Sequence, residues 1–285
     1  MKLALGTVQF GLPYGVSNQD GQTQPDEVAA ILARAAQGGI DTLDTARAYG
    51  ESEAVLGRLL PSLPPFRLIS KVPPIGGEAG KVRASVRESL EILGVDRLEA
   101  VMFHRSSDLL GDNGAACWRE LEALKAEGRI GKIGLSAYGR HELDEAVRRF
   151  PIEIVQVPAN VLDQRLLLDG TLSGLKSRGI EVHVRSALLQ GLLVMEKDKI
   201  PAFFDPIRTG LLAWSEACAR AGVSNLAGCL GFLNACEEID RVVVGVNNRA
   251  QLDEVITAAS VQLPFDCREF AIDEERFLNP SCWKV

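Results

Sequence analysis

The sequence TLDTARAYG, at residues 42–50, carries polar and titratable side chains directly after a short apolar stretch. Two later segments have the same arrangement, RLISKV at 67–72 and LEAVMFH at 98–104. Each segment is typical of a buried strand that runs into a loop. In a parallel α/β barrel, the C-terminal ends of the strands together form the active site. We therefore expect the polar residues of these three segments to converge.

Asp44, Tyr49, Lys71 and His104 are the residues at these strand ends, and they can deliver a proton to a substrate oxygen. A free tyrosine has a pKa of about 10. A neighbouring ammonium lowers the pKa of a phenol, and a carboxylate paired with that ammonium holds it in place. With His104 donating to the same oxygen, such a group can polarise a carbonyl and protonate the alkoxide that forms. The four residues predict an enzyme.

Short apolar runs alternate with longer amphipathic segments along the whole chain. The amphipathic segments place apolar residues on a helical period, and several stop at glycine, as at Gly38-Gly39, Gly94 and Gly128. Glycine is the usual left-handed residue after a helix. Eight strands alternating with eight helices predict an α/β fold, a closed (β/α)8 TIM barrel. The expected strands are 2–6, 40–45, 67–72, 98–104, 131–136, 152–157, 180–185 and 241–245.

A doubly wound open sheet is the alternative architecture. When such a sheet binds a dinucleotide, a GxGxxG turn usually follows its first strand. Here the first strand leads into GTVQFG at 6–11, which does not fit that pattern. No linker or low-complexity run divides the chain. We therefore expect residues 1–285 to form a single domain, with 261–285 as a C-terminal tail packed on an end of the barrel.

The composition predicts a soluble, cytoplasmic globular protein. Its 46% hydrophobic and 24% charged residues are typical of a globular protein with a large core. A net charge of −7 gives no reason to expect nucleic acid or an anionic membrane as a partner. We interpret the N-terminus as the first strand, not a signal peptide, and expect no membrane span. The cysteines form no CxxC pair and the histidines show no ligand spacing, so we expect reduced thiols and no metal.

The reactive segments resemble the signature of the aldo-keto reductase superfamily. The D-T-A-x-x-Y-G turn of that family stands here at 44–50, with Lys71 in ISKV and His104 in MFHR on later strands. The likeness also extends through Gly6-Thr7, LGVDRLE before the fourth strand, GLS at 134–136, QVPAN at 156–160 and LLQGLL at 188–193. It therefore covers almost the whole chain in order.

The resemblance implies reduction of an aldehyde or ketone, such as a sugar derivative, to an alcohol by hydride transfer. Tyr49 would be the general acid, Lys71 and Asp44 the pair that tunes it, and His104 the group that orients the carbonyl. NADPH is the expected cofactor, with NADH as the alternative. A small-molecule carbonyl substrate is the expected partner, and we favour a monomer.

The expected cofactor site includes the loops after the seventh and eighth strands, where barrels tend to bind phosphate. The second loop, GVNNRAQLDE at 245–254, opens a helix whose N–H groups favour an anion, although an ordinary capped surface helix is the alternative. By resemblance, Ser136 and Gln156 would hold the nicotinamide carboxamide, and Arg249 would meet the adenosine end. The full implied set is Gly6, Thr7, Asp44, Ser136, Gln156, Arg185, Ser186, Leu188, Gln190, Gly191, Gly245, Asn247, Arg249, Gln251 and Glu254.

The chain departs from the family at several of these positions. Arg185 stands where the family usually has an aromatic residue that stacks on the nicotinamide. Ala137 replaces a common Asn, Ala159 a common Tyr and Val255 a common Asn. Basic residues that could meet a 2′-phosphate are sparse, and Arg249 is the main candidate.

The substrate pocket is expected to include Phe10, Tyr14 and Arg47, although the two aromatic residues could equally pack at the barrel rim. Arg47, Arg105 and Arg165 suggest an anionic or polyhydroxylated substrate, with solvated loop charges as the alternative reading.

Two other functions stay open. One is a lyase or aldolase that forms a Schiff base on Lys71, which requires this lysine to be free of Asp44. The other is a cofactor-binding protein of the same fold with little turnover. The intact set of four residues argues against the second, while Arg185 and Ala137 argue for it.

Overall fold

Eight parallel strands form a closed barrel in the computed structural model, which describes residues 2–283. The strands pair in chain order, and β8 closes the ring against β1. All eight strands lie where the sequence predicted them, within two residues at each end, so the predicted fold is confirmed. They are β1 (Leu3–Gly6), β2 (Thr42–Asp44), β3 (Arg67–Val72), β4 (Leu98–Phe103), β5 (Ile130–Ser136), β6 (Ile154–Pro158), β7 (Glu181–Arg185) and β8 (Arg241–Gly245).

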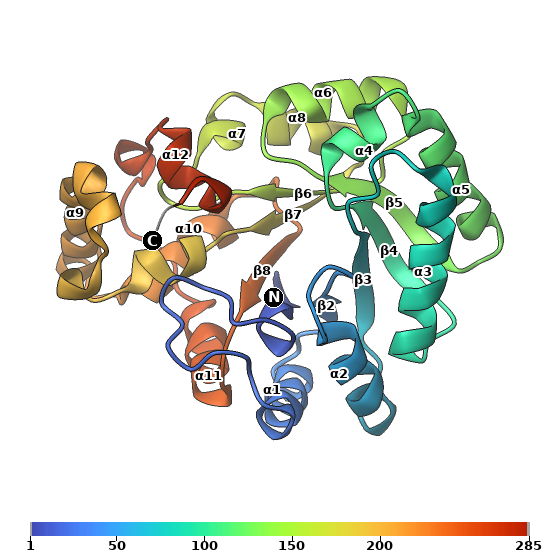
Figure 1. Ribbon diagram of the computed structural model, residues 1–285. Coiled ribbons are helices and arrows are strands. Elements are labelled where there is room, and N and C mark those ends of the chain that lie inside the picture. The colour runs from blue at the N-terminus through green and yellow to red at the C-terminus, as the bar shows by residue number, and fades with distance from the viewer. Residues whose placement is uncertain (1, 284–285) are drawn as a thin grey trace.

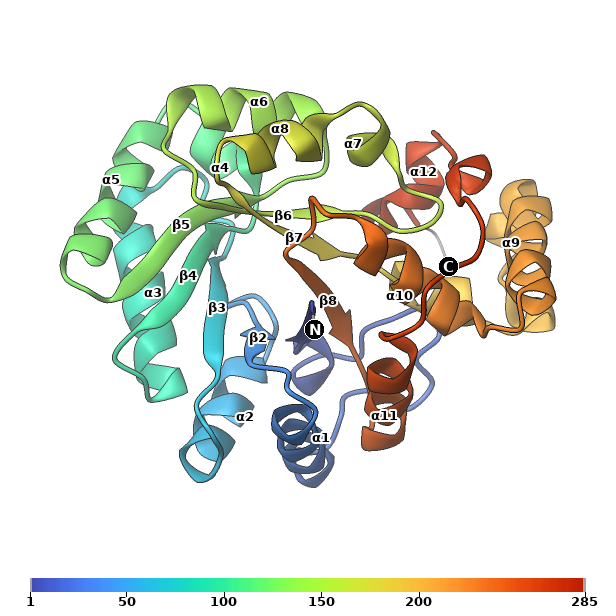
Figure 2. The same ribbon diagram turned by 180° about the vertical axis from the view of Figure 1, so that it is seen from behind.

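A ring of helices covers the outside of the barrel, one after each strand. Each of the longer helices packs an apolar face on the sheet, as in α1, where Val28, Ile31, Leu32 and Ala35 are buried. Figures 1 and 2 show the ring from opposite sides, with α11, the helix after β8, beside α1. The eight are α1 (Pro25–Gln37), α2 (Ser52–Leu59), α3 (Ala79–Leu93), α5 (Gly114–Ala126), α6 (Arg140–Arg149), α8 (Thr171–Ser177), α10 (Asn225–Ala235) and α11 (Arg249–Ala258).

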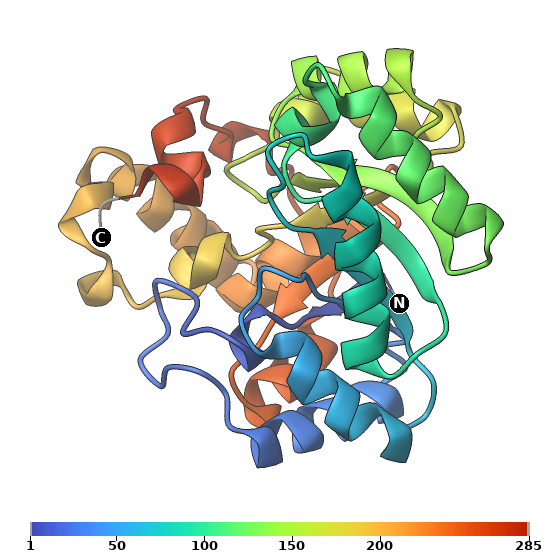
Figure 3. The ribbon, with the colours of Figure 1, turned by 45° about the vertical axis from the view of Figure 1, so that its right-hand side comes forward.

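Four helices add to the expected eight within the described residues. They are α4 (Ser106–Leu110), α7 (Arg165–Leu168), α9 (Arg208–Arg220) and α12 (Glu275–Leu278). The longest of them, α9, does not cover the sheet. Its buried residues, among them Trp214, belong to a second apolar core. Figure 3 shows α9 and the C-terminal segment together to one side of the ring.

The second core joins three parts of the chain that are far apart in sequence. Leu189 and Leu193 from the loop after β7 pack with Trp214 of α9 and with Phe277 of the C-terminal tail. The tail is also tied to the loop after β6, because the backbone N–H of Ile272 donates to the oxygen of Leu162 at 2.9 Å. The tail therefore packs against loops at the C-terminal ends of the strands.

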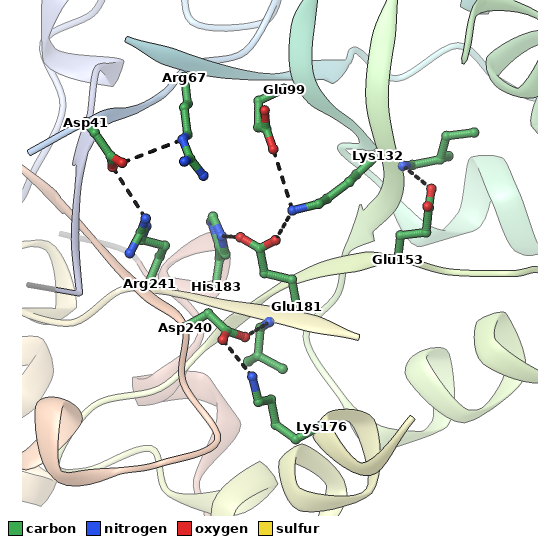
Figure 4. Close-up of polar contacts among 12 residues, drawn as sticks. Asp41, Arg67, Glu99, Lys132, Glu153, Lys176, Glu181, His183, Asp240 and Arg241 are labelled. Atoms are coloured by element: carbon green, nitrogen blue, oxygen red, sulfur yellow. Dashed lines mark hydrogen bonds and ion pairs between the residues drawn. The ribbon is translucent and has the colours of Figure 1, made fainter. Parts of the chain in front are cut away.

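The opposite end of the barrel, where the strands begin, carries a network of charged side chains (Figure 4). Lys132 on β5 lies between Glu99 on β4 and Glu181 on β7. Glu181 also contacts the buried ring of His183, with Oε1 2.7 Å from Nε2. Further pairs are Asp41 with Arg67 and Arg241, Lys125 with Glu153, and Lys176 with Asp240. In a barrel of this type, this end contributes to stability and the other to chemistry.

Candidate active site

Asp44, Tyr49, Lys71 and His104 lie together at the C-terminal ends of β2, β3 and β4. The ammonium Nζ of Lys71 is 2.6 Å from Oδ1 of Asp44 and 3.5 Å from the hydroxyl oxygen of Tyr49. The ring of His104 meets that of Tyr49 edge to face, with centroids 5.7 Å apart. The four side chains lie close together because β2, β3 and β4 are neighbours in the barrel.

Lys71 and Asp44 form a fully buried ion pair. Lys71 is 2% exposed, and its ammonium also donates to the backbone oxygen of Thr45 at 3.0 Å. The second carboxylate oxygen of Asp44 accepts a hydrogen bond from Nε2 of Gln156 at 2.7 Å. Burial lowers the pKa of Lys71, but the opposing influence of Asp44 and Tyr49 is greater, so its pKa is raised above the ordinary value. Lys71 is therefore charged at neutral pH.

The pKa of Tyr49 differs in direction from the sequence-based expectation. Burial, which disfavours the phenolate, is the largest influence and raises the pKa above its ordinary value. Lys71 acts in the opposite, expected direction, but it does not outweigh burial together with the charge of Asp44. The phenol therefore keeps its proton at neutral pH, as a proton donor must.

His104 is held in its neutral form. Burial and the nearby charge of Lys71 lower its pKa to about 4. Its Nδ1 is buried and has no hydrogen-bond partner among residues 2–283. A neutral imidazole has one N–H donor and one acceptor nitrogen. At neutral pH, His104 can therefore donate a hydrogen bond to a ligand without carrying a charge.

A cavity of about 1130 Å3 extends from this group of side chains along the end of the barrel. Tyr49 and His104 line one part of it, and Leu226 of α10 and Thr257 of α11 line another. Pockets for drug-sized ligands measure about 300–1,000 Å3, so this one can take a larger molecule. The cavity thus connects a proton-donating group to an extended binding surface.

Most residues that the sequence implied for a cofactor line this cavity. They are Gly6, Thr7, Asp44, Ser136, Gln156, Arg185, Ser186, Leu188, Gln190, Gly191, Gly245, Asn247, Gln251 and Glu254. Arg249 does not line it. Its exposed guanidinium lies with Nε 3.8 Å from a carboxylate oxygen of Asp253, and its backbone N–H donates to Glu27. The side-chain amide of Gln156 donates to Asp44, a contact that the sequence did not predict.

The loop after β7 has an unusual backbone. Ser186, Leu189 and Gln190 have φ of 59°, 48° and 54°, and within residues 2–283 they alone among non-glycine residues have positive φ. Gly191 follows with φ of 91°. Such strained conformations persist at binding sites, and alternation of right- and left-handed residues turns backbone N–H groups toward an anion. This loop is the best candidate for a phosphate-binding segment.

Several residues expected around the substrate lie elsewhere. Phe10 is 0% exposed and belongs to the main apolar core, because the short helical turn that carries it faces inward. Arg47 pairs with Glu88, and Arg165 pairs with Asp163 at 2.8 Å. Tyr14 does line the cavity, and its hydroxyl accepts a hydrogen bond from Gln190 at 3.2 Å.

The cavity also contains residues that the sequence analysis missed. Tyr138 lines it and stacks under Arg185, with the guanidinium carbon 4.1 Å from the ring centroid. This tyrosine comes shortly after β5, so the rule that found Tyr49 could have found it. Asn225 and Leu226 also line the cavity, at the start of α10. No strand precedes α10 directly, and the sequence carries no signal there.

The structure supplies two observations about other kinds of site. Among the described residues, no helix combines the length and apolar character needed to cross a membrane. Residues 2–283 contain no group of three or more His, Cys, Asp and Glu side chains that could hold a metal ion.

Comparisons with known proteins identify what the chain is similar to. The model of the aldo/keto reductase family matches residues 2–272. A protein named NADH-specific methylglyoxal reductase, from Escherichia coli strain K12, is 24% identical, over 92% of this chain and 90% of its own. A D-threo-aldose 1-dehydrogenase from a Pseudomonas species is 25% identical, over 92% of both chains. The solved holo form of an aldo-keto reductase from Bacillus halodurans has the same fold, with a TM-score of 0.77, 20% identity, and coverage of 94% of this chain and 90% of its own.

Proposed function

The chain belongs to the aldo/keto reductase family, and from that premise we propose that it reduces the carbonyl of a small aldehyde or ketone to an alcohol with a nicotinamide cofactor. The observation that carries this proposal is the environment of Tyr49. Its protonated phenol lines the cavity, and its oxygen lies 3.5 Å from the charged ammonium of Lys71. This arrangement suits proton donation to a substrate oxygen.

Each of the four residues has a separate part in the proposed reaction. A reduced nicotinamide cofactor, when bound in this cavity, would supply the hydride that the carbonyl carbon accepts. Tyr49 donates its proton to the carbonyl oxygen as negative charge develops there. Lys71 stabilises the phenolate that remains, and Asp44 keeps Lys71 charged and in position. The neutral imidazole of His104 donates a hydrogen bond to the same oxygen and stabilises its charge.

The cavity residues fit a dinucleotide. The left-handed loop that begins at Ser186 can turn its N–H groups toward a pyrophosphate. Gln9 Oε1 and Asn247 Oδ1 are buried, line the cavity and have no partner among the described residues. Each can accept a hydrogen bond from a ribose hydroxyl or a carboxamide. Buried polar atoms of this kind call for a partner, because leaving them unpaired is costly.

The charges at the α11 end of the cavity favour NADH over NADPH, whereas the family resemblance alone favoured NADPH. Glu254 lines the cavity there and has no ion-pair partner among residues 2–283, Asp253 also lines it but pairs with Arg34, and Arg249 does not line it. Carboxylates accept hydrogen bonds from the 2′-hydroxyl of NAD and repel the 2′-phosphate of NADP. The Escherichia coli relative that is named NADH-specific agrees with this choice.

The two alternative functions have less support. A Schiff base requires an unprotonated lysine, whereas Lys71 is charged and its ammonium lies 2.6 Å from Asp44. A cofactor-binding protein without turnover has no need of a protonated Tyr49 beside Lys71.

Cofactor titration combined with one substitution tests the proposal. We expect NADH to bind saturably and more tightly than NADPH, as measured by fluorescence at fixed salt. Tyr49→Phe should keep the Kd for NADH within about twofold and lower the rate of carbonyl reduction by about 10²–10⁴-fold, because only the proton donor is lost. Retained turnover in this variant would contradict the role of Tyr49, and binding of neither cofactor would contradict the proposed reaction.

A further inference from the structure

Arg185 differs from the other partly buried arginines of the protein. It is the last residue of β7, it is half-buried, and no carboxylate among residues 2–283 lies within ion-pair distance of it. Every other half-buried arginine in the described chain pairs with a carboxylate. These are Arg34, Arg47, Arg83, Arg165, Arg208 and Arg241. A partly desolvated charge without a counter-ion is unfavourable, so Arg185 calls for an anionic partner.

The guanidinium of Arg185 is held in place but keeps free hydrogen-bonding capacity. It stacks 4.1 Å above the ring of Tyr138, which is exposed at the cavity wall. Its two hydrogen bonds are long, 3.4 Å from Nε to the hydroxyl of Ser136 and 3.5 Å from Nη2 to the backbone oxygen of Ala137. Five N–H donors are available on a guanidinium. The remaining donors can therefore serve a ligand in the cavity.

The other charges at this end of the cavity do not neutralise Arg185. Among the described residues, Asp44 is the one carboxylate at the end of the cavity that Tyr49 and His104 line (the reactive end), and it is already paired with Lys71. His104 is neutral at neutral pH. The remaining carboxylates that line the cavity, Asp253 and Glu254, belong to α11 at the other end. The reactive end thus carries one net positive charge among the described residues, and Arg185 is its source.

We propose that Arg185 binds a carboxylate of the substrate, so that the protein acts on aldehyde or keto acids in preference to neutral carbonyl compounds. This inference rests on the proposed reduction. Both Arg185 and Tyr49 line the reactive end, and they approach it from different strands, β7 and the segment after β2. A substrate whose carbonyl meets Tyr49 can therefore place a second group against Arg185. The planar guanidinium matches a carboxylate, which it can bind through two parallel hydrogen bonds.

Matched substrates test this specificity. Succinic semialdehyde and butanal share a four-carbon aldehyde, but only the first carries a carboxylate. We expect a higher kcat/KM for succinic semialdehyde in the unmodified protein. Arg185→Met should lower the ratio of kcat/KM for succinic semialdehyde to kcat/KM for butanal about 10–100-fold, mainly through the KM for the acid, because it removes a charge-assisted contact that butanal lacks. Arg185→Lys should keep part of the preference, since it retains the charge.

Arg178→Met provides the control, because Arg178 is exposed, lies at the end of α8 and does not line the cavity. This control variant should leave kcat/KM unchanged for both aldehydes. Equal kcat/KM values for the two aldehydes in the unmodified protein would overturn the proposal. An equal loss of kcat/KM for both aldehydes in Arg185→Met would also overturn it. So would a large loss of NADH affinity in Arg185→Met, because Arg185 would then act on the cofactor.

Calorimetry with 4-hydroxybutyrate separates this inference from the proposed reaction. The unmodified protein should bind this hydroxy acid, and Arg185→Met should bind it at least about tenfold more weakly. Such a difference would support the carboxylate site even in a protein that binds no nicotinamide cofactor, where the proposed reduction itself would have failed. Equal binding by both proteins would overturn the site.

Discussion

Burial has opposite consequences for the titratable residues of the site. It raises the pKa of Tyr49 and lowers that of His104, because in each case it disfavours the charged form. Burial also lowers the pKa of Lys71, but the neighbouring Asp44 carboxylate, together with Tyr49, outweighs this effect and keeps Lys71 charged. The site therefore contains a protonated phenol, a neutral imidazole and one charged pair. Each group is in the form that the proposed carbonyl reduction needs at neutral pH.

The pH dependence of the reaction should reflect these values. His104 becomes charged only as the pH falls through about 4, and Tyr49 loses its proton only above its ordinary value of about 10. We expect kcat for reduction, at saturating cofactor, to stay level between about pH 5.5 and 9, without an inflection near the ordinary histidine pKa of about 6.5. A step near pH 6.5 that disappears in His104→Gln would contradict the neutral state of His104.

The residue types of the site were predictable from the sequence, but their surroundings were not. Asp44, Lys71 and His104 could be chosen because each lies at a strand end. The sequence does not show how deeply Tyr49 is buried, so the predicted direction of its pKa shift was wrong. It also does not show that Glu88 pairs with Arg47, which keeps this arginine out of the cavity.

At the level of elements, the strands were predictable because a barrel buries them on both faces. That environment selects short apolar runs, and glycine marks several helix ends, as at Gly94 with φ of 67°. The helices α9 and α12 could not be placed in the same way, because they pack on the second core instead of the sheet. Their contacts join distant segments, which local periodicity does not record.

The charged network where the strands begin should stabilise the barrel without affecting its chemistry. The hydrogen bond from His183 lowers the pKa of Glu181 to about 2, with Lys132 acting in the same direction. A carboxylate with a lowered pKa contributes stability above its unfolded pKa of about 4.3, and this contribution is lost as the pH falls toward 2. Glu181→Gln should therefore lower the free energy of unfolding at pH 7 by roughly 1–3 kcal/mol.

Urea unfolding at several pH values measures this contribution. The difference between Glu181→Gln and the unmodified protein should shrink as the pH falls from 5 toward 3, while the Kd for NADH at pH 7 stays the same. Glu196→Gln serves as the control, because Glu196 forms only an exposed pair with Lys199, and such pairs contribute little. A difference that is the same at pH 7 and pH 3 would refute the assignment to ionised Glu181.

At the level of the whole molecule, the C-terminal tail supports the loop that is the candidate phosphate site. Phe277 is 1% exposed and packs in the same core as Leu189 and Leu192 of that loop. Its ring also meets that of Phe203, with centroids 5.6 Å apart. The conformation of the loop after β7 therefore depends on residues more than eighty positions later in the chain, which no local motif could reveal.

Phe277→Ala should loosen this loop. Removing a buried phenylalanine costs about 3–5 kcal/mol of stability. We expect the variant to bind NADH at least about tenfold more weakly and to be cleaved faster by protease within 186–207, because its anchor is lost. Phe150→Ala is the matched control, since Phe150 is buried against Trp118 in the main core. A similar loss of NADH affinity in both variants would show that general destabilisation, not the tail, is responsible.

The ion pair of Lys71 and Asp44 limits how this protein can evolve. Alone among the ion pairs of residues 2–283, it has both side chains fully buried. Replacing either partner leaves an unpaired charge inside the barrel, at a cost of about 3–5 kcal/mol, whereas replacing both with apolar residues can leave stability unchanged. If selection for the proposed catalysis ceased, replacing the two residues one at a time would therefore pass through a less stable intermediate. Lys71 and Asp44 can therefore persist after selection for their proposed catalytic role has ended, because folding protects them.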